Sequence, residues 1–315
     1  MPINTKWLLC GTAAVAGTLA GLAWITRRNE QRSARAHPPV GRFIEVDGVR
    51  LHYAEFGQGG PPLVLLHGHN SMIQDFVAGG LAQAASARYR TIVFDRPGCG
   101  YSSRPRGRVW TPQAQAELLR KALQHLGVDQ PIVVGVSWGA LVAMALALDH
   151  PHHVRSLVLV SGYLYPTIRL DALPFAALAI PGLGTALAYA GASFLGRFVW
   201  PGMTRKVFAP QQVPPEHASF PLALVLRPLQ LRTAAAEGFL MMPAALTLSR
   251  RYGGLKVPLA VVAGTEDRMI DTDRHSARLC RELPKAWCRL VPGLGHMVHY
   301  HPHHVLAAVE ATQQA

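Results

Sequence analysis

Two apolar patterns alternate along most of this chain of 315 residues. Short runs rich in β-branched residues are apolar at successive positions, which predicts strands buried on both faces of a sheet. Longer stretches rich in Ala and Leu lie between several of them and predict helices, as at 138–150. Strands that alternate with helices at this spacing predict an α/β fold with a mostly parallel, doubly wound sheet. The predicted strands are 62–66, 90–94, 132–136, 156–160, 258–263 and 287–291.

Two further segments depart from this repeat. Residues 42–46 and 49–53 alternate between apolar and polar positions around Asp47-Gly48, which predicts a β-hairpin. From about residue 163 to 257, prolines interrupt short apolar pieces, which predicts a helical insertion over the sheet, here called the cap. The expected organisation is therefore a core in two parts, 37–162 and 257–315, a cap at 163–256, and an N-terminal anchor with its linker at 1–36.

The N-terminal segment has a different character. Residues 7–26 contain no charge, and twenty such residues can cross about 30 Å of hydrocarbon as one transmembrane helix. A cleaved signal peptide is the alternative, but the apolar stretch is long for one and arginines stand where cleavage would occur. We predict a single-pass membrane anchor followed by a linker at 33–39. The excess of arginine after the span favours a catalytic part on the cytoplasmic side.

The net charge and the cysteine content limit which binding partners, cofactors and compartments can be expected. The formal net charge is +13, but no Lys/Arg run alternates with aromatic residues, so no nucleic acid is expected and an anionic lipid surface fits better. Cys280 and Cys288 are expected to be unpaired structural thiols, and a disulfide between them in an oxidising compartment is the open alternative. The histidines near the C-terminus lack the carboxylate and cysteine spacing of a metal site. No phosphate loop or dinucleotide pattern is present, so neither metal nor cofactor is expected.

One motif combines strand, turn and helix in the order that nucleophilic catalysis needs. Gly135-Val136-Ser137-Trp138-Gly139 has the pattern G-x-S-x-G between a predicted strand and a predicted helix. Such a turn forces strained dihedrals on the serine and needs small residues on either side of it. Other polar groups follow strand ends, at His67-Gly68-His69, at 264–267 and at 293–296. In a parallel sheet these ends meet at one edge.

The order of serine, aspartate and histidine, each just past a strand end, with a His-Gly pair after an earlier strand, resembles the α/β-hydrolase fold family over about residues 40–315. The resemblance implies a nucleophile at Ser137, a general base at His296 and an orienting carboxylate at Asp267. It also implies an oxyanion hole formed by the backbone N–H groups of His69 and Trp138. Glu266 competes with Asp267 but is expected to face solvent.

The nucleophile and the cap together suggest the reaction. Relatives that open epoxides or displace halide use aspartate at this turn, so a serine implies acyl transfer through an acyl-enzyme. Residues 170–203 of the cap contain only two charges, which favours a lipophilic acyl ester as the small-molecule substrate. The prediction is therefore a serine esterase or lipase-like enzyme. Hydrolysis of amides, peptides or C–C bonds on the same triad, as in iminopeptidases, is the alternative, and a non-catalytic binding module is a third.

Overall fold

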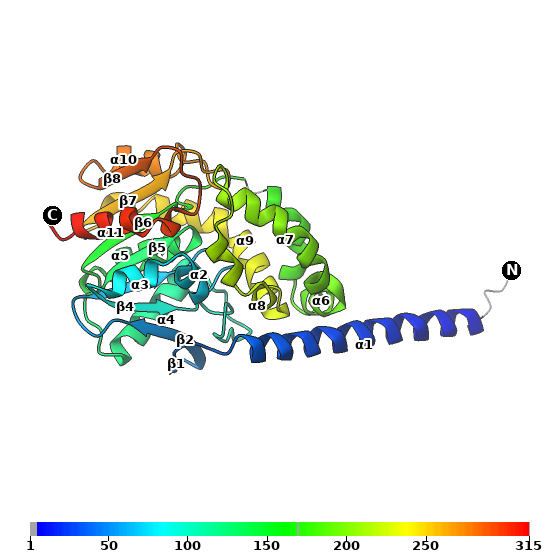
Figure 1. The fold of residues 1–315 in the computed structure, drawn as a ribbon. Helices are drawn as coiled ribbons and strands as arrows, with labels where there is room; N and C mark the ends of the chain where they lie inside the picture. The colour runs from blue at the N-terminus through cyan, green and yellow to red at the C-terminus, as the bar shows by residue number, and fades with distance from the viewer. Residues whose placement is uncertain (1–4, 169, 315) are drawn as a thin grey trace.

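The computed structural model describes residues 5–168 and 170–314, except for the side chains of residues 5–16, 19 and 170–174. Its centre is an eight-stranded sheet with the order β1-β2-β4-β3-β5-β6-β7-β8 (Figure 1). The predicted mostly parallel sheet is confirmed, because β4, β3, β5, β6, β7 and β8 all run in parallel. The strands are β1 (Arg42–Val46), β2 (Val49–Phe56), β3 (Pro62–Leu66), β4 (Arg90–Phe94), β5 (Ile132–Val136), β6 (Ser156–Val160), β7 (Leu259–Gly264) and β8 (Trp287–Val291).

The first two strands form the predicted hairpin. β1 and β2 pair antiparallel with Val46 opposite Val49, so Asp47 and Gly48 make the two-residue turn. Both turn residues have positive φ, 49° and 73°, which is the backbone that Asp-Gly hairpins adopt. β2 then pairs antiparallel with β4 and joins the hairpin to the parallel part of the sheet.

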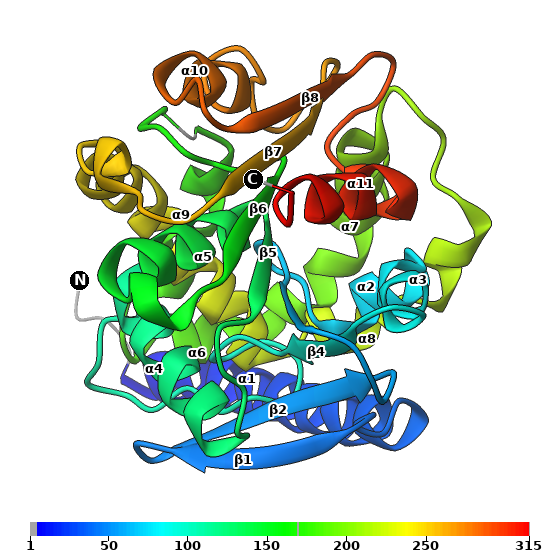
Figure 2. The same cartoon turned by 90° about the vertical axis from the view of Figure 1, so that its left-hand side faces the viewer.

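Helices cover both faces of the sheet (Figure 2). On β3, Val64 and Leu66 pack into one core, while Leu63 and Leu65 pack into the other, which explains the continuous apolar runs. The first core contains residues from α4 (Pro112–His125), α5 (Trp138–Asp149) and α10 (Ser276–Glu282). The second contains residues from α2 (Ile73–Ala78), α3 (Leu81–Ser86) and α11 (Pro302–Ala311).

The segment between β6 and β7 contains helices and turns and, in its described residues, no strand. Its longest helix, α9 (Pro228–Ser249), lies over the core and extends back towards α5 (Figure 1). The helical pieces of the cap are η2 (Leu170–Ala179), α6 (Leu183–Leu187), η3 (Ala188–Ala192), α7 (Ser193–Phe208), η4 (Pro215–Ser219), α8 (Leu222–Val225), α9 (Pro228–Ser249) and η5 (Tyr252–Gly254).

The N-terminal helix differs from its prediction. α1 (Thr5–Ala36) is one continuous helix, so residues 33–36 are helical and not a linker. Residues 27–36 are mostly good helix formers, and the helix ends only before Pro38-Pro39. In the part of the chain that the structure describes, no helix is both long enough and apolar enough to cross a membrane. The predicted transmembrane span is therefore unsupported, although the side chains at 7–16 and 19 lie outside the described residues.

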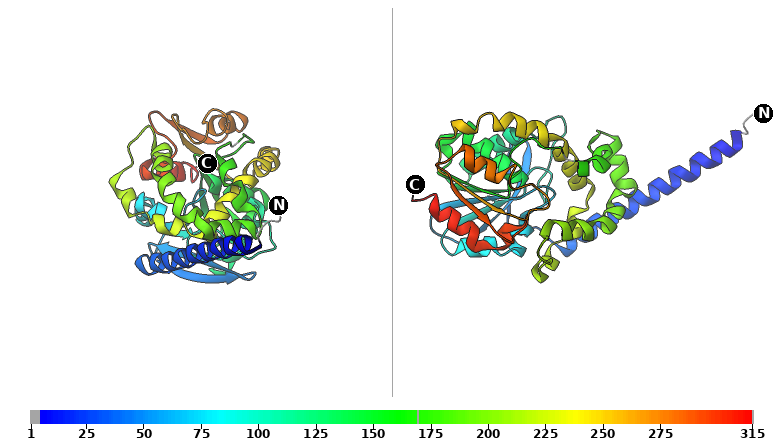
Figure 3. Two further views of the ribbon diagram at one scale, coloured as in Figure 1. Left: turned by 90° about the vertical axis from the view of Figure 1, so that its right-hand side faces the viewer. Right: turned by 90° about the horizontal axis from the view of Figure 1, so that it is seen from above.

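The second half of α1 packs against the cap. Thr26 Oγ1 donates a hydrogen bond of 3.1 Å to the carbonyl of Tyr189, and the Arg27 guanidinium lies 5.7 Å from the Tyr189 ring centre. The first half extends away from the rest of the molecule (Figure 3). The second half of α1 therefore belongs to the folded body through its contact with η3.

Cys280 and Cys288 form a disulfide between α10 and β8, which decides between the two alternatives that the sequence leaves open. Their Cα atoms lie 6.1 Å apart, a separation typical of disulfides. Disulfides persist mainly in oxidising compartments, so this one is at odds with the predicted cytoplasmic orientation. Cys99 is free and buried, and burial raises its thiol pKa to about 12.

Candidate active site

Ser137 occupies a strained turn between β5 and α5. Its φ of 54° and ψ of −113° lie outside the regions that L-residues favour, as the G-x-S-x-G pattern predicts. A methyl group on Gly139 would come within 2.3 Å of the Leu66 carbonyl oxygen, and one on Gly135 within 2.5 Å of the Gly139 carbonyl oxygen. Only glycine fits at either position, so the two glycines allow the close packing that holds Ser137 at the end of the strand.

His296 and Asp267 are brought together from loops that are 29 residues apart. His296 Nδ1 lies 2.7 Å from Asp267 Oδ2. The other carboxylate oxygen, Oδ1, accepts hydrogen bonds from the backbone N–H groups of Met269 and Ile270, at 2.7 and 2.9 Å. These bonds fix the carboxylate, whose side chain is only 1% exposed. Glu266 is exposed, as the sequence analysis expects.

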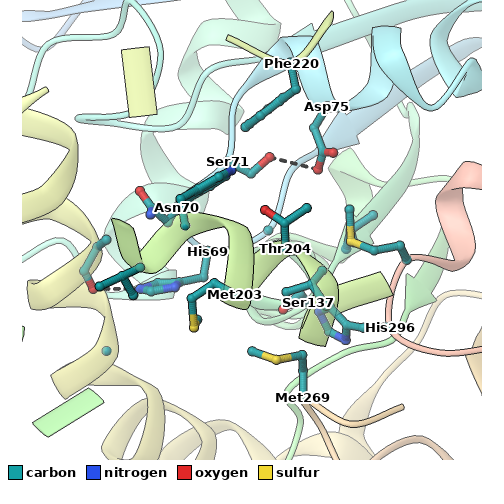
Figure 4. A pocket seen from close by; sticks show the side chains of 18 of the residues that line it. His69, Asn70, Ser71, Asp75, Ser137, Met203, Thr204, Phe220, Met269 and His296 are labelled. Atoms are coloured by element: carbon teal, nitrogen blue, oxygen red, sulfur yellow. Dashed lines mark hydrogen bonds between the residues drawn. The ribbon is translucent and has the colours of Figure 1, made fainter. Parts of the chain in front are cut away.

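The proton arrangement of His296 follows from its partner. A carboxylate can only accept hydrogen bonds, so Nδ1 carries the proton and donates a hydrogen bond to Asp267. In the neutral ring, Nε2 is then available to accept a proton from another group. Ser137 and His296 line the same cavity (Figure 4). Among the contacts of the described residues no hydrogen bond joins them, and such bonds are often longer before substrate binds.

The loop after β3 runs directly beside Ser137. A methyl group on Gly68 would come within 3.2 Å of Ser137 Cβ, which places the following residue, His69, next to the nucleophile. The His69 ring is held by its Nε2, which donates to the Ala234 carbonyl of α9 at 2.7 Å. The other predicted oxyanion donor, Trp138, is the first residue of α5, where backbone N–H groups point out of the helix. Both remain predicted donors.

A buried arginine that the sequence analysis did not identify fixes this loop. Arg96 Nε donates to the His67 carbonyl at 2.9 Å, and Arg96 Nη2 donates to the Gly68 carbonyl at 2.7 Å. The Arg96 backbone N–H also donates to His67 Nε2 at 3.0 Å. Burial and the charge of Arg96 lower the His67 pKa to about 4, so the ring is neutral near pH 7. The only sequence signal for Arg96 is its place after Asp95 at a strand end.

Arg96 also ties the loop to the cap. Its guanidinium pairs with Glu237 of α9, and both side chains are fully buried. Gln115 joins them, accepting from Arg96 Nη1 at 3.0 Å. Burial alone would raise the pKa of Glu237, but the charge of Arg96 and its hydrogen bond lower that pKa below its usual value. An ionised Glu237 therefore balances the Arg96 charge, and the position of α9 is coupled to the loop beside Ser137.

The cavity above Ser137 has a volume of about 230 Å³. Most of its wall is apolar and comes from the cap, and Met203 and Met269 lie on the side of Ser137 and His296 (Figure 4). A polar region at another part of the wall contains Ser71, Asp75 and His299. The apolar residues of the wall include Leu178, Val199, Met203, Val207, Leu231, Met241, Met269 and Ile270.

Two other groups of polar side chains lie outside the predicted triad. Asp95 is buried and accepts from the N–H groups of Ile73 and Tyr101, at 2.9 and 2.8 Å, so it orders the turn after β4. His303 and His304 lie together, with ring centres 4.0 Å apart. Within the described residues, no group of three His, Cys, Asp or Glu side chains is arranged to hold a metal ion.

Comparison with known proteins places this geometry in a family. The model of the alpha/beta hydrolase fold matches residues 61–301, so the chain belongs to the alpha/beta hydrolase fold family, and the predicted resemblance is confirmed. The names of its relatives include those of hydrolases, such as the 2-hydroxymuconate semialdehyde hydrolase of Pseudomonas putida.

Three other similar proteins share 22–31% of the aligned residues with this chain. Haloalkane dehalogenase 2 of Mycobacterium tuberculosis is 30% identical over 42% of this chain and 46% of its own length, so the chain spans under half of that relative. The magnesium-chelatase 30 kDa subunit of Rhodobacter capsulatus is 31% identical over 76% of this chain and 82% of its own length. The crystal structure of a membrane phospholipase A, described as a bacterial virulence factor, covers 99% of both chains with a TM-score of 0.68 and 22% identity, which indicates a shared fold.

Proposed function

We propose that this chain is a serine hydrolase that cleaves carboxylic esters, preferring lipophilic acyl groups, through an acyl-enzyme on Ser137, His296 and Asp267. The observation that carries the proposal is the 2.7 Å contact between His296 Nδ1 and Asp267, in the same cavity wall as a strained Ser137. The contact leaves His296 Nε2 as the acceptor of a proton. A serine hydroxyl needs such a base to become a nucleophile.

The reaction then follows from the positions of these groups. Ser137 Oγ attacks the ester carbonyl while His296 Nε2 takes its proton, and Asp267 stabilises the charged ring that results. The carbonyl oxygen becomes negative and accepts hydrogen bonds from the backbone N–H groups of Trp138 and His69. Each such donor contributes about 3 kcal/mol to the transition state. His296 returns the proton to the leaving alcohol, and water later resolves the acyl-enzyme with His296 as base.

The choice of ester and of a lipophilic acyl group rests on the cavity. Its wall is mainly aliphatic and methionine side chains, which exclude water and favour an alkyl chain by about 0.8 kcal/mol for each buried CH₂ group. The phospholipase that shares the fold is named for activity on lipids, which agrees with this preference. Amides, peptides and C–C bonds would use the same three residues, so they belong in the same substrate test.

A panel of p-nitrophenyl esters from acetate to palmitate tests the proposal, together with matched anilides. We expect kcat/KM to rise with acyl length at first and to remain low for the anilides. The Ser137→Ala and His296→Ala variants should each lose activity by about three orders of magnitude or more, because the triad acts as a unit. Faster cleavage of the anilides, or a variant with a loss below tenfold, would contradict the proposal.

A further inference from the structure

The cavity beside Ser137 contains a second group of polar side chains, here called the Asp75 cluster: Ser71, Asp75, His217, His299 and Tyr300. Asp75 accepts hydrogen bonds from Ser71 Oγ at 2.8 Å, from Tyr300 OH at 3.1 Å and from His299 Nε2 at 3.2 Å. His217 Nδ1 lies 2.9 Å from Tyr300 OH. Four of the five residues, all except Tyr300, line the same cavity as the nucleophile.

The hydrogen bonds of the cluster show which group is ionised and which groups donate. Burial alone would raise the Asp75 pKa, but the charge and hydrogen bond of His299, with the hydrogen bond of Ser71, lower it to about 2. Asp75 is therefore ionised and only accepts. Tyr300 must donate to it, and His217 Nδ1 then donates to the Tyr300 oxygen. His299 uses Nε2 for its bond to Asp75, so its other ring nitrogen, Nδ1, is left for a different partner.

Several polar atoms of this cavity have no partner. Among the described residues, His299 Nδ1, Thr204 Oγ1 and Asn70 Oδ1 are buried without any hydrogen bond, and all three residues line the cavity. His299 is only 1% exposed. A buried polar atom without a partner costs about 1–3 kcal/mol, so native proteins keep few of them. Three at one cavity indicate a ligand that supplies the missing partners.

The positions of these atoms relate the Asp75 cluster to the chemistry. In Figure 4, Thr204 of α7 lies between Ser137 and His296 on one side and Ser71 and Asp75 on the other. Thr204 and Ser137 line the same cavity, so a group bound against Thr204 would share that cavity with the reacting ester. A purely structural role, joining the cap to the core, would explain the Asp75 hydrogen bonds. It would not explain the unpartnered atoms of Thr204 and His299.

The same atoms define the chemistry of the ligand. The Asp75 carboxylate already accepts three hydrogen bonds, so most of its acceptor sites are occupied and an ammonium group finds few of them open. Among the described residues of the cavity, the atoms that remain without a partner are the Thr204 hydroxyl, the Asn70 amide oxygen and the second ring nitrogen of His299. A hydroxyl group carries no charge and both donates and accepts hydrogen bonds, so free hydroxyl groups on the ligand can pair with all three atoms.

We propose that the Asp75 cluster, with Thr204 and Asn70, forms a subsite for the alcohol part of the substrate, and that this part bears free hydroxyl groups, as in a glyceryl ester. This proposal rests on the esterase function proposed above. It assigns the two ends of one cavity to two parts of the substrate. The apolar wall receives the acyl chain, and the Asp75 cluster receives the hydroxylated leaving group.

The test compares two esters of the same acid, the 2,3-dihydroxypropyl and the n-propyl ester of decanoic acid. We expect wild-type kcat/KM to be at least about tenfold higher for the hydroxylated ester, because the propyl ester leaves the polar groups of the subsite without partners. Thr204→Val removes one hydroxyl at nearly constant shape. It should lower kcat/KM for the hydroxylated ester about 3- to 10-fold more than for the propyl ester, which is the effect of one hydrogen bond.

A matched control and a third substrate sharpen the test. Thr247→Val removes an exposed hydroxyl from α9, away from the cavity lining, and should change neither ester. Equal rates for the two esters, equal losses on both in Thr204→Val, or a preference for the charged 2-aminoethyl ester would each overturn the subsite. A fluorophosphonate labels the nucleophile whatever the leaving group. Normal labelling with no ester preference therefore rejects the subsite alone, whereas absent labelling rejects the hydrolase as well.

Discussion

The buried histidine of the loop beside Ser137 makes the stability of the protein depend on pH in a defined way. Burial and the charge of Arg96 lower the His67 pKa from 6.5 to about 4. At about 1.4 kcal/mol for each pKa unit, the shift corresponds to about 3 kcal/mol of folding free energy. The folded-state pKa lies below the unfolded value, so the fold favours the neutral ring. This contribution is complete above pH 6.5 and is lost as the pH falls towards 4.

The His67→Gln variant isolates this contribution. Glutamine does not titrate, and its carbonyl oxygen can accept the hydrogen bond that Arg96 N–H donates to His67 Nε2. Between pH 7 and pH 4.5, wild type should lose about 2 kcal/mol more unfolding free energy than the variant. Urea titrations followed by tryptophan fluorescence measure the unfolding free energy of both proteins at each pH. The titration of the carboxyl groups that both proteins share cancels in the difference. Equal losses would refute the assignment of a neutral, buried His67.

Three further predictions concern other contacts. Glu237→Gln leaves the buried Arg96 without a counter-charge and should lower the unfolding free energy by about 3 kcal/mol, whereas Glu310→Gln, at an exposed pair with Arg88, should change it little in the same urea titration. Replacing Cys280 and Cys288 by serine opens a loop of nine residues and should cost about 2.5 kcal/mol in thermal or urea unfolding; alkylation of both thiols in the unreduced wild type would contradict the disulfide. Gly139→Ala places a methyl group 2.3 Å from the Leu66 carbonyl and should lower the melting temperature strongly, whereas Gly202→Ala, in open space on α7, should be neutral or stabilising.

The strands and the turn at Ser137 follow from local pattern. Runs such as 132–136 can only be buried on both faces, and a glycine on either side of Ser137 allows one close-packed turn. These features need no knowledge of the rest of the chain. The observed strands accordingly begin and end within a few residues of their predicted bounds.

Features that depend on how distant segments meet could not be predicted in this way. Arg96 and Glu237 are 141 residues apart, and their pairing depends on where α9 lies over the core. The Asp75 cluster likewise joins residues more than 200 positions apart. At the N-terminus, the apolar composition of 7–26 predicts a helix that ends near residue 26. The helix-forming residues that follow continue α1 to Ala36, into the predicted linker.

Peptide mapping by mass spectrometry after treatment with a fluorophosphonate tests the central proposal most directly, because the reagent reacts with a serine only where a base activates it. We expect a single adduct on the peptide that carries Ser137, and no adduct in the His296→Ala protein. A wild-type protein that stays unmodified, or an adduct on any serine other than Ser137, would contradict the proposed catalytic site.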